Sequence, residues 1–344
     1  MSDSPSPKIS STRMPALRSV LHPEKFVRTK IVIGALVVAV IVFVVAGTFD
    51  PRTASTAGAT PPVGLGSAAP FAVLAGTTIT NTCLLYTSVQ DADGAFIANV
   101  AQGSRKDVRD AVVAARAAQP RWQNATAYNR GQVLYRLAEM AESRRDELVH
   151  QVKAAEGLST PDAESTVSAS IDLIIYYAGW TDKVAQVLGG SNPVAGPFFN
   201  FSVPTPTGVI GVLAPTSSSL LGFVQTVLPP LCSGNAVVVM ASEERPIPGL
   251  LLGEMSATAD FPGGVLNIIS GQLGEVAPTL ASHEDVDGLD LTGASIEQAG
   301  EWARSAADSI KRVFVPRSGD ESLSSLRRLR AFIETATVWH TIGQ

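Results

Sequence analysis

The sequence predicts an α/β fold in which a parallel β-sheet is covered by helices on both faces. Two short uncharged segments, GVIGVLAP at 208–215 and NAVVVMAS at 235–242, have the length and the Val- and Ile-rich composition of buried strands. An apolar segment of helical length, 220–231, lies between them. Apolar strands that alternate with helices are typical of a parallel sheet buried on both sides. Further strands are expected at 265–269 and 288–291.

Three helices are expected before the first of these strands. Ser104 can cap a helix that runs to about residue 118, and Pro120 is expected to end it. Longer helices are expected at about 128–155 and 161–188, each followed by glycine as a stop signal. These helices are expected to pack on the α/β sheet.

Composition and charge exclude several classes of function. The 344 residues carry 26 Lys and Arg against 31 Asp and Glu, a formal net charge of −5, so no nucleic-acid partner is expected. Two cysteines, Cys83 and Cys232, are too few for a disulfide framework, and the four histidines show no metal-ligand spacing. No metal site is expected, and Cys232 is expected to be a small buried core residue.

The first 88 residues differ in character from the rest. A basic segment, 1–30, precedes the uncharged segment 31–49 (IVIGALVVAVIVFVVAGTF). At ~1.5 Å per residue this segment nearly spans the ~30 Å core of a bilayer. The Lys and Arg excess before it predicts a transmembrane helix of a single-pass membrane protein, with the N-terminus in the cytoplasm. A buried core segment and a cleaved signal peptide are the alternatives. Residues 50–88 are expected to form a linker with a foreign-looking strand and junction.

Two resemblances lie in this linker region. Residues 65–82 (LGSAAPFAVLAGTTITNT) resemble the opening of secreted ice-binding β-solenoid proteins. No repeats follow, and a solenoid needs several stacked coils to bury its core, so no ice binding is expected.

The hexapeptide 83–88 (CLLYTS) resembles translated adapter sequence that joins unrelated reads in assembled metagenomes. This suggests an artificial fusion of residues 1–88 with a cytoplasmic-enzyme fragment at 89–344, and an ordinary short strand is the alternative.

From residue 89 onward the chain resembles the aldehyde dehydrogenase superfamily. The blocks that carry the resemblance follow the family's order: RKDVRDAVVAARAAQPRW, IDLIIYYAGWTDKV, GVIGVLAP, SGNAVVVMASE, FPGGVLNIISG, HEDVDGLDLTGAS and IKRVFV. The resemblance implies a Rossmann-type NAD(P)-binding domain at 89–315 and a remnant tail at 316–344. Segment 335–342 of this tail resembles the family's oligomerisation strand. The reaction that the family implies is NAD(P)-dependent oxidation of aldehydes through a cysteine thiohemiacetal.

The resemblance also implies which residues would face the cofactor. Glu243 would accept hydrogen bonds from ribose hydroxyls, although Met240 stands where the family has a lysine. The turn Thr292–Ala294 keeps the glycine of the family's phosphate-side motif, and backbone N–H groups at a helix start can bind a pyrophosphate. The cofactor-facing positions are Pro215, Thr216, Ser217, Ser242, Glu243, Gly271, Thr292, Gly293 and Ala294. Because the lysine is absent, NAD(P) binding is expected to be weak or vestigial.

The catalytic groups of the family are not found. Ser217 stands at the position of the oxyanion asparagine, and Pro316 at the position of the general-base glutamate. No cysteine follows Cys232. Oxyanion stabilisation, activation of water and thiolate attack each need one of these groups. No catalytic residue is therefore assigned.

Four functions remain open from the sequence. The chain is interpreted first as a pseudoenzyme subunit that binds NAD(P) weakly and forms a homo- or hetero-oligomer with a full-length aldehyde dehydrogenase. The second interpretation is a truncated or chimeric fragment with no function of its own. The others are an active oxidoreductase that uses unrecognised residues and a membrane-anchored extracellular binding protein. Losing one oxyanion-hole donor alone costs ~10²–10³ in rate, so the joint absence of the three groups argues against the active oxidoreductase.

Overall fold

The structure is a computed structural model that describes residues 86–317 and 326–342. Every described residue belongs to one unit of the chain, Ser67–Gln344. The expected membrane segment, the segment that resembles ice-binding proteins and Cys83 lie outside the described residues.

A five-stranded parallel sheet forms the centre of the domain. Its spatial order is β7-β6-β5-β8-β9, and all four pairings are parallel. Every residue of β5 and β6 is buried, which explains why these segments show no alternation of polar and apolar residues. The predicted parallel sheet is confirmed. The strands are β5 (Val209–Leu213), β6 (Ala236–Met240), β7 (Leu266–Ile269), β8 (Gly288–Asp290) and β9 (Arg312–Phe314).

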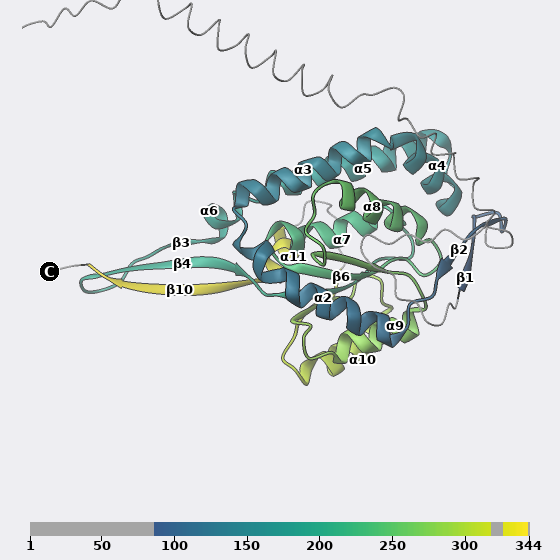
Figure 1. Ribbon diagram of the computed structural model, residues 1–344. Coiled ribbons are helices and arrows are strands. Elements are labelled where there is room, and N and C mark those ends of the chain that lie inside the picture. The colour runs from purple at the N-terminus through teal and green to yellow at the C-terminus, as the bar shows by residue number, and fades with distance from the viewer. Residues whose placement is uncertain (1–85, 318–325, 343–344) are drawn as a thin grey trace, which may run out of the picture. The chain divides into compact units, whose positions relative to one another are not determined.

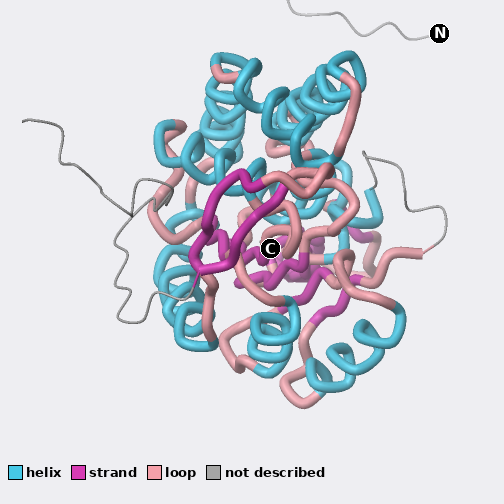
Figure 2. Tube along the Cα trace, turned by 90° about the vertical axis from the view of Figure 1, so that its right-hand side faces the viewer, coloured by secondary structure: helices cyan, strands magenta, loops and turns pink. Residues whose placement is uncertain are grey.

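Helices cover both faces of this sheet, and in Figure 2 the strands lie between helices on either side. One face is covered by α2 (Arg105–Asn124), α9 (Leu273–Ser282) and α10 (Ile296–Ala307). The other face is covered by α7 (Leu221–Cys232) and α8 (Ile247–Thr258). Successive strand residues point to opposite faces, so the two faces have separate apolar clusters. The expected α/β architecture with helices on both faces is confirmed.

A further helical layer packs outside α7 and α8. It consists of α3 (Ala127–Ser143), α4 (Arg145–Glu156) and α5 (Thr160–Ala178), followed by the short α6 (Val184–Leu188). Helix α5 packs on α7, whereas α3 and α4 both contact α8. Figure 1 shows this layer along one side of the sheet. The α7 face of the sheet is therefore covered by two layers of helices, whereas the α2 face is covered by one.

The helices depart from the sequence prediction at their ends. Helix α2 continues past Pro120, because Trp122 is buried and donates a hydrogen bond from Nε1 to the Leu231 carbonyl at 3.0 Å. This tertiary contact holds the last turn. The helix expected at 128–155 is interrupted at Arg144, which caps both α3 and α4. The helix expected at 161–188 is interrupted after α5, which has Gly179 as its C-cap.

Two antiparallel strands precede the helices. They are β1 (Tyr86–Gln90) and β2 (Phe96–Ala101). Strand β1 crosses the expected boundary between residues 88 and 89, and its first three residues belong to the hexapeptide 83–88. The described part of that hexapeptide is therefore an ordinary strand, which was the alternative to a foreign junction.

A second sheet projects from the body of the domain in Figure 1, and we call it the β arm. It has the order β10-β4-β3, with β3 (Gly190–Asn192), β4 (Phe198–Pro206) and β10 (Ile333–Thr341) all antiparallel. Strand β10 pairs with β4 along its whole length. Most side chains of β10 are exposed, and Trp339 has an exposed fraction of 60%. A strand was expected in this part of the tail, and one is present.

The tail contributes to the core as well as to the arm. Helix α11 (Leu326–Ala331) places Leu329 and the following Phe332 among the buried residues of the α7 face. The Phe332 carbonyl accepts hydrogen bonds from Asn235 Nδ2 at 3.0 Å and from Thr207 N at 3.2 Å. The segment expected to be a remnant is therefore an integral part of the domain.

The prediction of a single-pass membrane protein is corrected by the structure. Among residues 86–317 and 326–342, no helix combines the length and the apolar composition needed to cross a membrane. Even the longest of these helices, α2, carries charged side chains along its exposed surface.

Truncation of Phe332 should destabilise the domain strongly. The side chain has an exposed fraction of 0%, so Phe332→Ala leaves a cavity and should lower the free energy of unfolding by about 3–5 kcal/mol. Trp339→Ala is the matched control from the same tail, because it truncates an exposed ring and should change that free energy by less than about 0.5 kcal/mol. Denaturant unfolding followed by circular dichroism measures both. Equal losses would contradict the placement of the tail in the core.

Candidate cofactor site

The connections of the central sheet reverse direction at β5. From β5 the chain passes through α7 to β6 and through α8 to β7, and then returns through α9 to β8 on the other side of β5. In open parallel sheets, ligands bind outside the carboxyl ends of the strands at such a reversal. Two segments lie at these ends: the loop 214–220 after β5 and the turn Thr292–Ala294 after β8. The topology therefore places the candidate site between them.

Gly293 brings the turn into direct contact with β5. Its N–H donates a hydrogen bond to the Leu213 carbonyl at 2.8 Å. A Cβ on Gly293 would lie 2.2 Å from the Ala214 carbonyl oxygen, far inside van der Waals contact. Only glycine allows this close approach of two backbones. The glycine retained from the phosphate-side motif therefore has a packing role as well as its expected cofactor-facing position.

Thr292 is held by a buried ion pair that the sequence analysis missed. Asp290, at the end of β8, has an exposed fraction of 0%, and its partner Arg328, on α11, one of 3%. The Asp290 carboxylate accepts hydrogen bonds from the Thr292 hydroxyl and, at 3.0 Å, from the Thr292 N–H. Arg328 Nη1 donates to Thr292 Oγ1 at 2.9 Å. Burial raises the pKa of Asp290, and the guanidinium and the hydroxyl oppose that rise.

The loop after β5 is held by a carboxylate of the chain itself. Glu156, the last residue of α4, accepts hydrogen bonds from Ser219 N and Ser219 Oγ, both at 2.6 Å. The Ser218 hydroxyl accepts from Gly222 N at 3.0 Å. Two backbone N–H groups near the start of α7 are therefore already paired. Ser217, at the expected oxyanion position, and its neighbour Thr216 are exposed at the tip of the loop, next to the half-buried Pro215.

Glu243 and Ser242 follow β6 at the same edge of the sheet. The Glu243 side chain is half-buried, and its carboxylate accepts a hydrogen bond from Leu273 N at 3.0 Å, at the start of α9. Ser242 is buried, and its hydroxyl accepts from Arg245 N at 3.2 Å. The expected ribose-binding carboxylate is present at this edge, and it also caps a helix. This second role could not be read from the sequence block.

Gly271 follows β7 and has a positive φ of +150°. A Cβ at this position would lie 2.9 Å from Gly103 N. The neighbouring Ser270 carbonyl accepts the Gly103 N–H at 2.7 Å. Gly271 therefore lets the segment before α2 pack tightly against the end of β7.

The structure also places the residues at the expected positions of the general base and the buried cysteine. Pro316 is exposed in the segment after β9. Cys232 ends α7 with an exposed fraction of 0%, and burial raises the pKa of its thiol to about 12. Because the thiolate is the nucleophilic form, Cys232 is unreactive near neutral pH. In the described chain, no group of three or more His, Cys, Asp or Glu residues could hold a metal ion.

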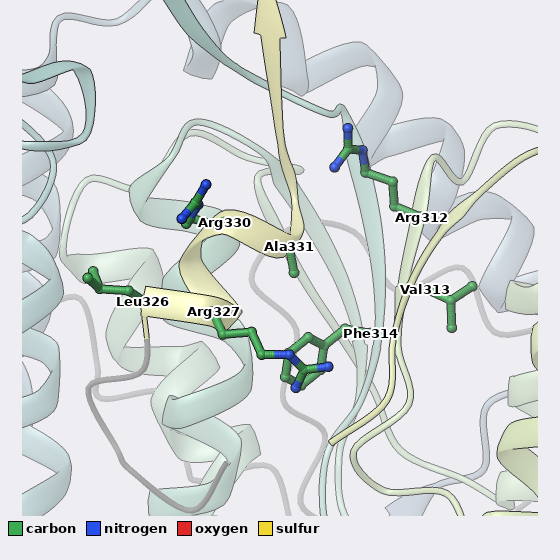
Figure 3. A pocket seen from close by; sticks show the side chains of 7 residues that line it. All are labelled: Arg312, Val313, Phe314, Leu326, Arg327, Arg330 and Ala331. Atoms are coloured by element: carbon green, nitrogen blue, oxygen red, sulfur yellow. The ribbon is translucent and has the colours of Figure 1, made fainter. Parts of the chain in front are cut away.

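Two cavities of the domain lie away from this site. One, of about 510 Å³, is lined by residues of β9 and α11, with Arg327 lying over the Phe314 ring in Figure 3. The second, of about 480 Å³, lies where the start of α2 meets the end of α9. The expected cofactor-facing residues line neither cavity.

The fold and the site together define a dehydrogenase-type cofactor domain, and comparison with known proteins gives its family. Residues 81–324 match the aldehyde dehydrogenase family. The chain belongs to this family, as the resemblance implied. The match begins before residue 89 and ends inside the tail, so it extends beyond both expected boundaries of the NAD(P)-binding domain.

Two curated relatives and one solved structure illustrate the similarity. The mitochondrial aldehyde dehydrogenase of Rattus norvegicus is 35% identical over 248 residues, 68% of this chain and 45% of the relative. An aldehyde dehydrogenase of Davidiella tassiana is 32% identical over 233 residues, 67% and 46% respectively. The NAD+ complex of an aldehyde dehydrogenase from Bacillus cereus superposes with a TM-score of 0.63 at 27% identity, covering 67% of this chain and 47% of that one. The chain therefore spans less than half the length of these relatives.

The thiol of Cys232 should be inert in the folded chain. In a Cys83→Ser background Cys232 is the only thiol, and a chromogenic thiol reagent at pH 8 should label it only after denaturant is added. Because its folded pKa of about 12 exceeds the ordinary value of 9.0, its contribution to stability is present below pH 9 and is lost between about pH 9 and 12. Cys232→Val should remove this part of the alkaline loss. Rapid labelling of the native protein would contradict the burial.

Proposed function

We propose that this chain is a non-catalytic, NAD(P)-binding subunit that assembles with a full-length aldehyde dehydrogenase. The observation that carries the proposal is a folded cofactor domain, at 89–315 with its tail at 316–344, that lacks the three catalytic groups. Ser217 replaces the oxyanion asparagine, Pro316 replaces the general base, and the thiol of Cys232 is buried. The family's reaction needs all three functions.

Weak cofactor binding is supported by the chemistry at the sheet edge. The residues that would hold NAD(P) are Glu243, for the ribose, and the turn Thr292–Ala294, for the pyrophosphate. Gly293 provides the close backbone approach that such a turn needs. The backbone N–H groups of all three turn residues already donate within the chain, to Asp290, Leu213 and Leu291, so the residues fit the cofactor only in part. However, the carboxylate of Glu156 already binds the N–H of Ser219 near the start of α7. An incoming pyrophosphate would meet negative charge there, which opposes tight binding.

The β arm supports assembly with another subunit. It exposes large apolar side chains, among them Phe199 with an exposed fraction of 49% and Trp339 with one of 60%. In the described sheet, β10 is hydrogen-bonded on one side only, to β4. An unpaired edge strand with exposed aromatic residues is a ready template for pairing with another chain. The resemblance of this segment to the family's oligomerisation strand points to the same role.

The second candidate is a truncated or chimeric fragment without a function of its own. It is favoured by the coverage of less than half of the relatives' length. Against it stands the tail, which buries Leu329 and Phe332 in the core instead of leaving an open break. Sequencing across codons 80–90 of the source DNA tests the fusion directly, because a genuine gene is continuous there.

Residual NAD affinity should depend on Glu243. We expect a dissociation constant of ~0.1–1 mM for NAD+ from affinity arithmetic, because a single clamp side chain remains. Glu243→Ala should weaken binding further, whereas Glu244→Ala, which removes the exposed neighbouring carboxylate, should leave it unchanged. Isothermal titration calorimetry of both variants measures this. Micromolar binding that survives Glu243→Ala would refute this description of the site.

No thiol-dependent aldehyde oxidation is expected from this chain alone. The purified full chain is incubated with a broad aldehyde panel and NAD+, and NADH formation is followed by absorbance. We expect no rate above the blank, because the nucleophile must reach both the aldehyde carbon and the nicotinamide, and Cys232 lies inside the core. NADH formation that Cys232→Ser abolishes, with the circular dichroism spectrum unchanged, would show that the chain is an active enzyme.

A further inference from the structure

We propose that Arg328 is a positioning residue for the turn Thr292–Ala294, so that the tail helix α11 sets the geometry of the cofactor-facing edge. The effect on cofactor affinity rests on the NAD(P) binding proposed above. The effect on the turn itself does not. Neither role follows from the family's cofactor blocks, since Arg328 lies beyond residue 324, where the family match ends.

The contacts form a closed set around the first residue of the turn. Arg328 Nη1 meets both the Asp290 carboxylate and the Thr292 hydroxyl. The same carboxylate binds the hydroxyl and the N–H of Thr292. One residue further on, Gly293 is fixed to the Leu213 carbonyl. The turn is therefore held from two sides, by the β5 backbone and by the Asp290–Arg328 pair.

The burial of the pair makes Arg328 necessary for this arrangement. A carboxylate inside the sheet is costly unless a cation and hydrogen bonds compensate it. Arg328 is the only basic side chain with a described contact to Asp290. The guanidinium has few other anchors: it lies over the Phe314 ring at 4.4 Å, and its Nε is buried without an acceptor. The described hydrogen bonds of the guanidinium therefore all come from Nη1, and they go to Asp290 and Thr292.

The arginine reaches the turn because α11 is anchored in the core. Leu329, in the last turn of α11, and Phe332, directly after the helix, are buried against the α7 face. Arg328 stands 38 residues after Asp290, so the contact links separate parts of the chain. A shift of α11 would move the guanidinium and release Thr292. The tail thereby acts on a site that it does not line.

Removal of the guanidinium should loosen the turn. Arg328→Met keeps the length and the apolar stem of the side chain but leaves Asp290 without its cation. Thr292 then loses one hydrogen-bond donor, and the Asp290 carboxylate that accepts the Thr292 N–H loses the cation that holds it in place. We expect about tenfold weaker NAD+ binding and faster amide hydrogen exchange in the peptide that contains the turn.

The matched control is Leu134→Ala in the full-length chain. It removes a fully buried side chain from α3, outside the tail, so it should lower Tm without truncating an anchor of α11. NAD+ affinity is measured by calorimetry and turn exchange by mass spectrometry, at a temperature where both variants are folded. We expect Leu134→Ala to match the wild type in both, and Arg328→Lys to restore part of the affinity. Equal effects of Arg328→Met and Leu134→Ala would overturn the proposal.

A double variant covers the case in which Arg328→Met does not fold. Asp290→Asn with Arg328→Met removes both charges and leaves no unpaired buried ion. We expect this variant to fold and to exchange the turn amides faster than the wild type, whereas wild-type exchange would overturn the role of Arg328. If the wild-type chain binds no NAD+, the proposed cofactor function fails, and the exchange data still decide whether Arg328 positions the turn.

Discussion

The buried pair of Asp290 and Arg328 is the constraint on which the rest of the domain depends. A carboxylate at the end of a strand with no exposed surface requires a cation at the same depth, and the chain supplies it from the tail helix α11. To bring Arg328 there, α11 must pack on the α7 face, which buries Leu329 and Phe332 and directs the following residues into β10. The electrostatic requirement in the sheet and the apolar burial of Leu329 and Phe332 together place the tail, and with it the base of the β arm.

The edge of the sheet that was expected to face the cofactor combines features of the backbone with side chains that bind one another. The reversal of connections at β5 and the close approach of Gly293 remain, since both are properties of the backbone. The side chains around them now bind one another. Glu156 is bound to Ser219, Glu243 to the start of α9, and Asp290 to Thr292 and Arg328. The hydrogen-bonding groups named here are therefore largely satisfied within the chain.

The central sheet could be predicted from the sequence, because strands buried on both faces, such as β5 and β6, are continuous apolar runs. The end of α2 could not be predicted, because the helix is held past Pro120 by a hydrogen bond from Trp122 to the Leu231 carbonyl, which is distant in the sequence. Asp290 does carry a signal in the sequence, because a charge at the end of an expected buried strand demands a buried partner. No local pattern points to Arg328, however, because the two positions are joined only by the packing of α11. Residues identified from the family blocks, such as Glu243 and Thr292, lie at the expected edge of the sheet. Their hydrogen-bond partners could be identified only from the fold.

The β arm has a geometric consequence for assembly. Of its two outer strands, β3 has three residues and β10 has nine, so only the β10 edge is long enough to form an extended ladder. Antiparallel pairing of this edge with the same edge of an identical chain is isologous: a twofold axis relates the two strands, and each occupies the other's free edge. Such a contact closes at two chains and leaves no long edge for a third. An arm with two long edges would instead propagate into a filament, so the brevity of β3 limits the growth of any assembly that the arm nucleates.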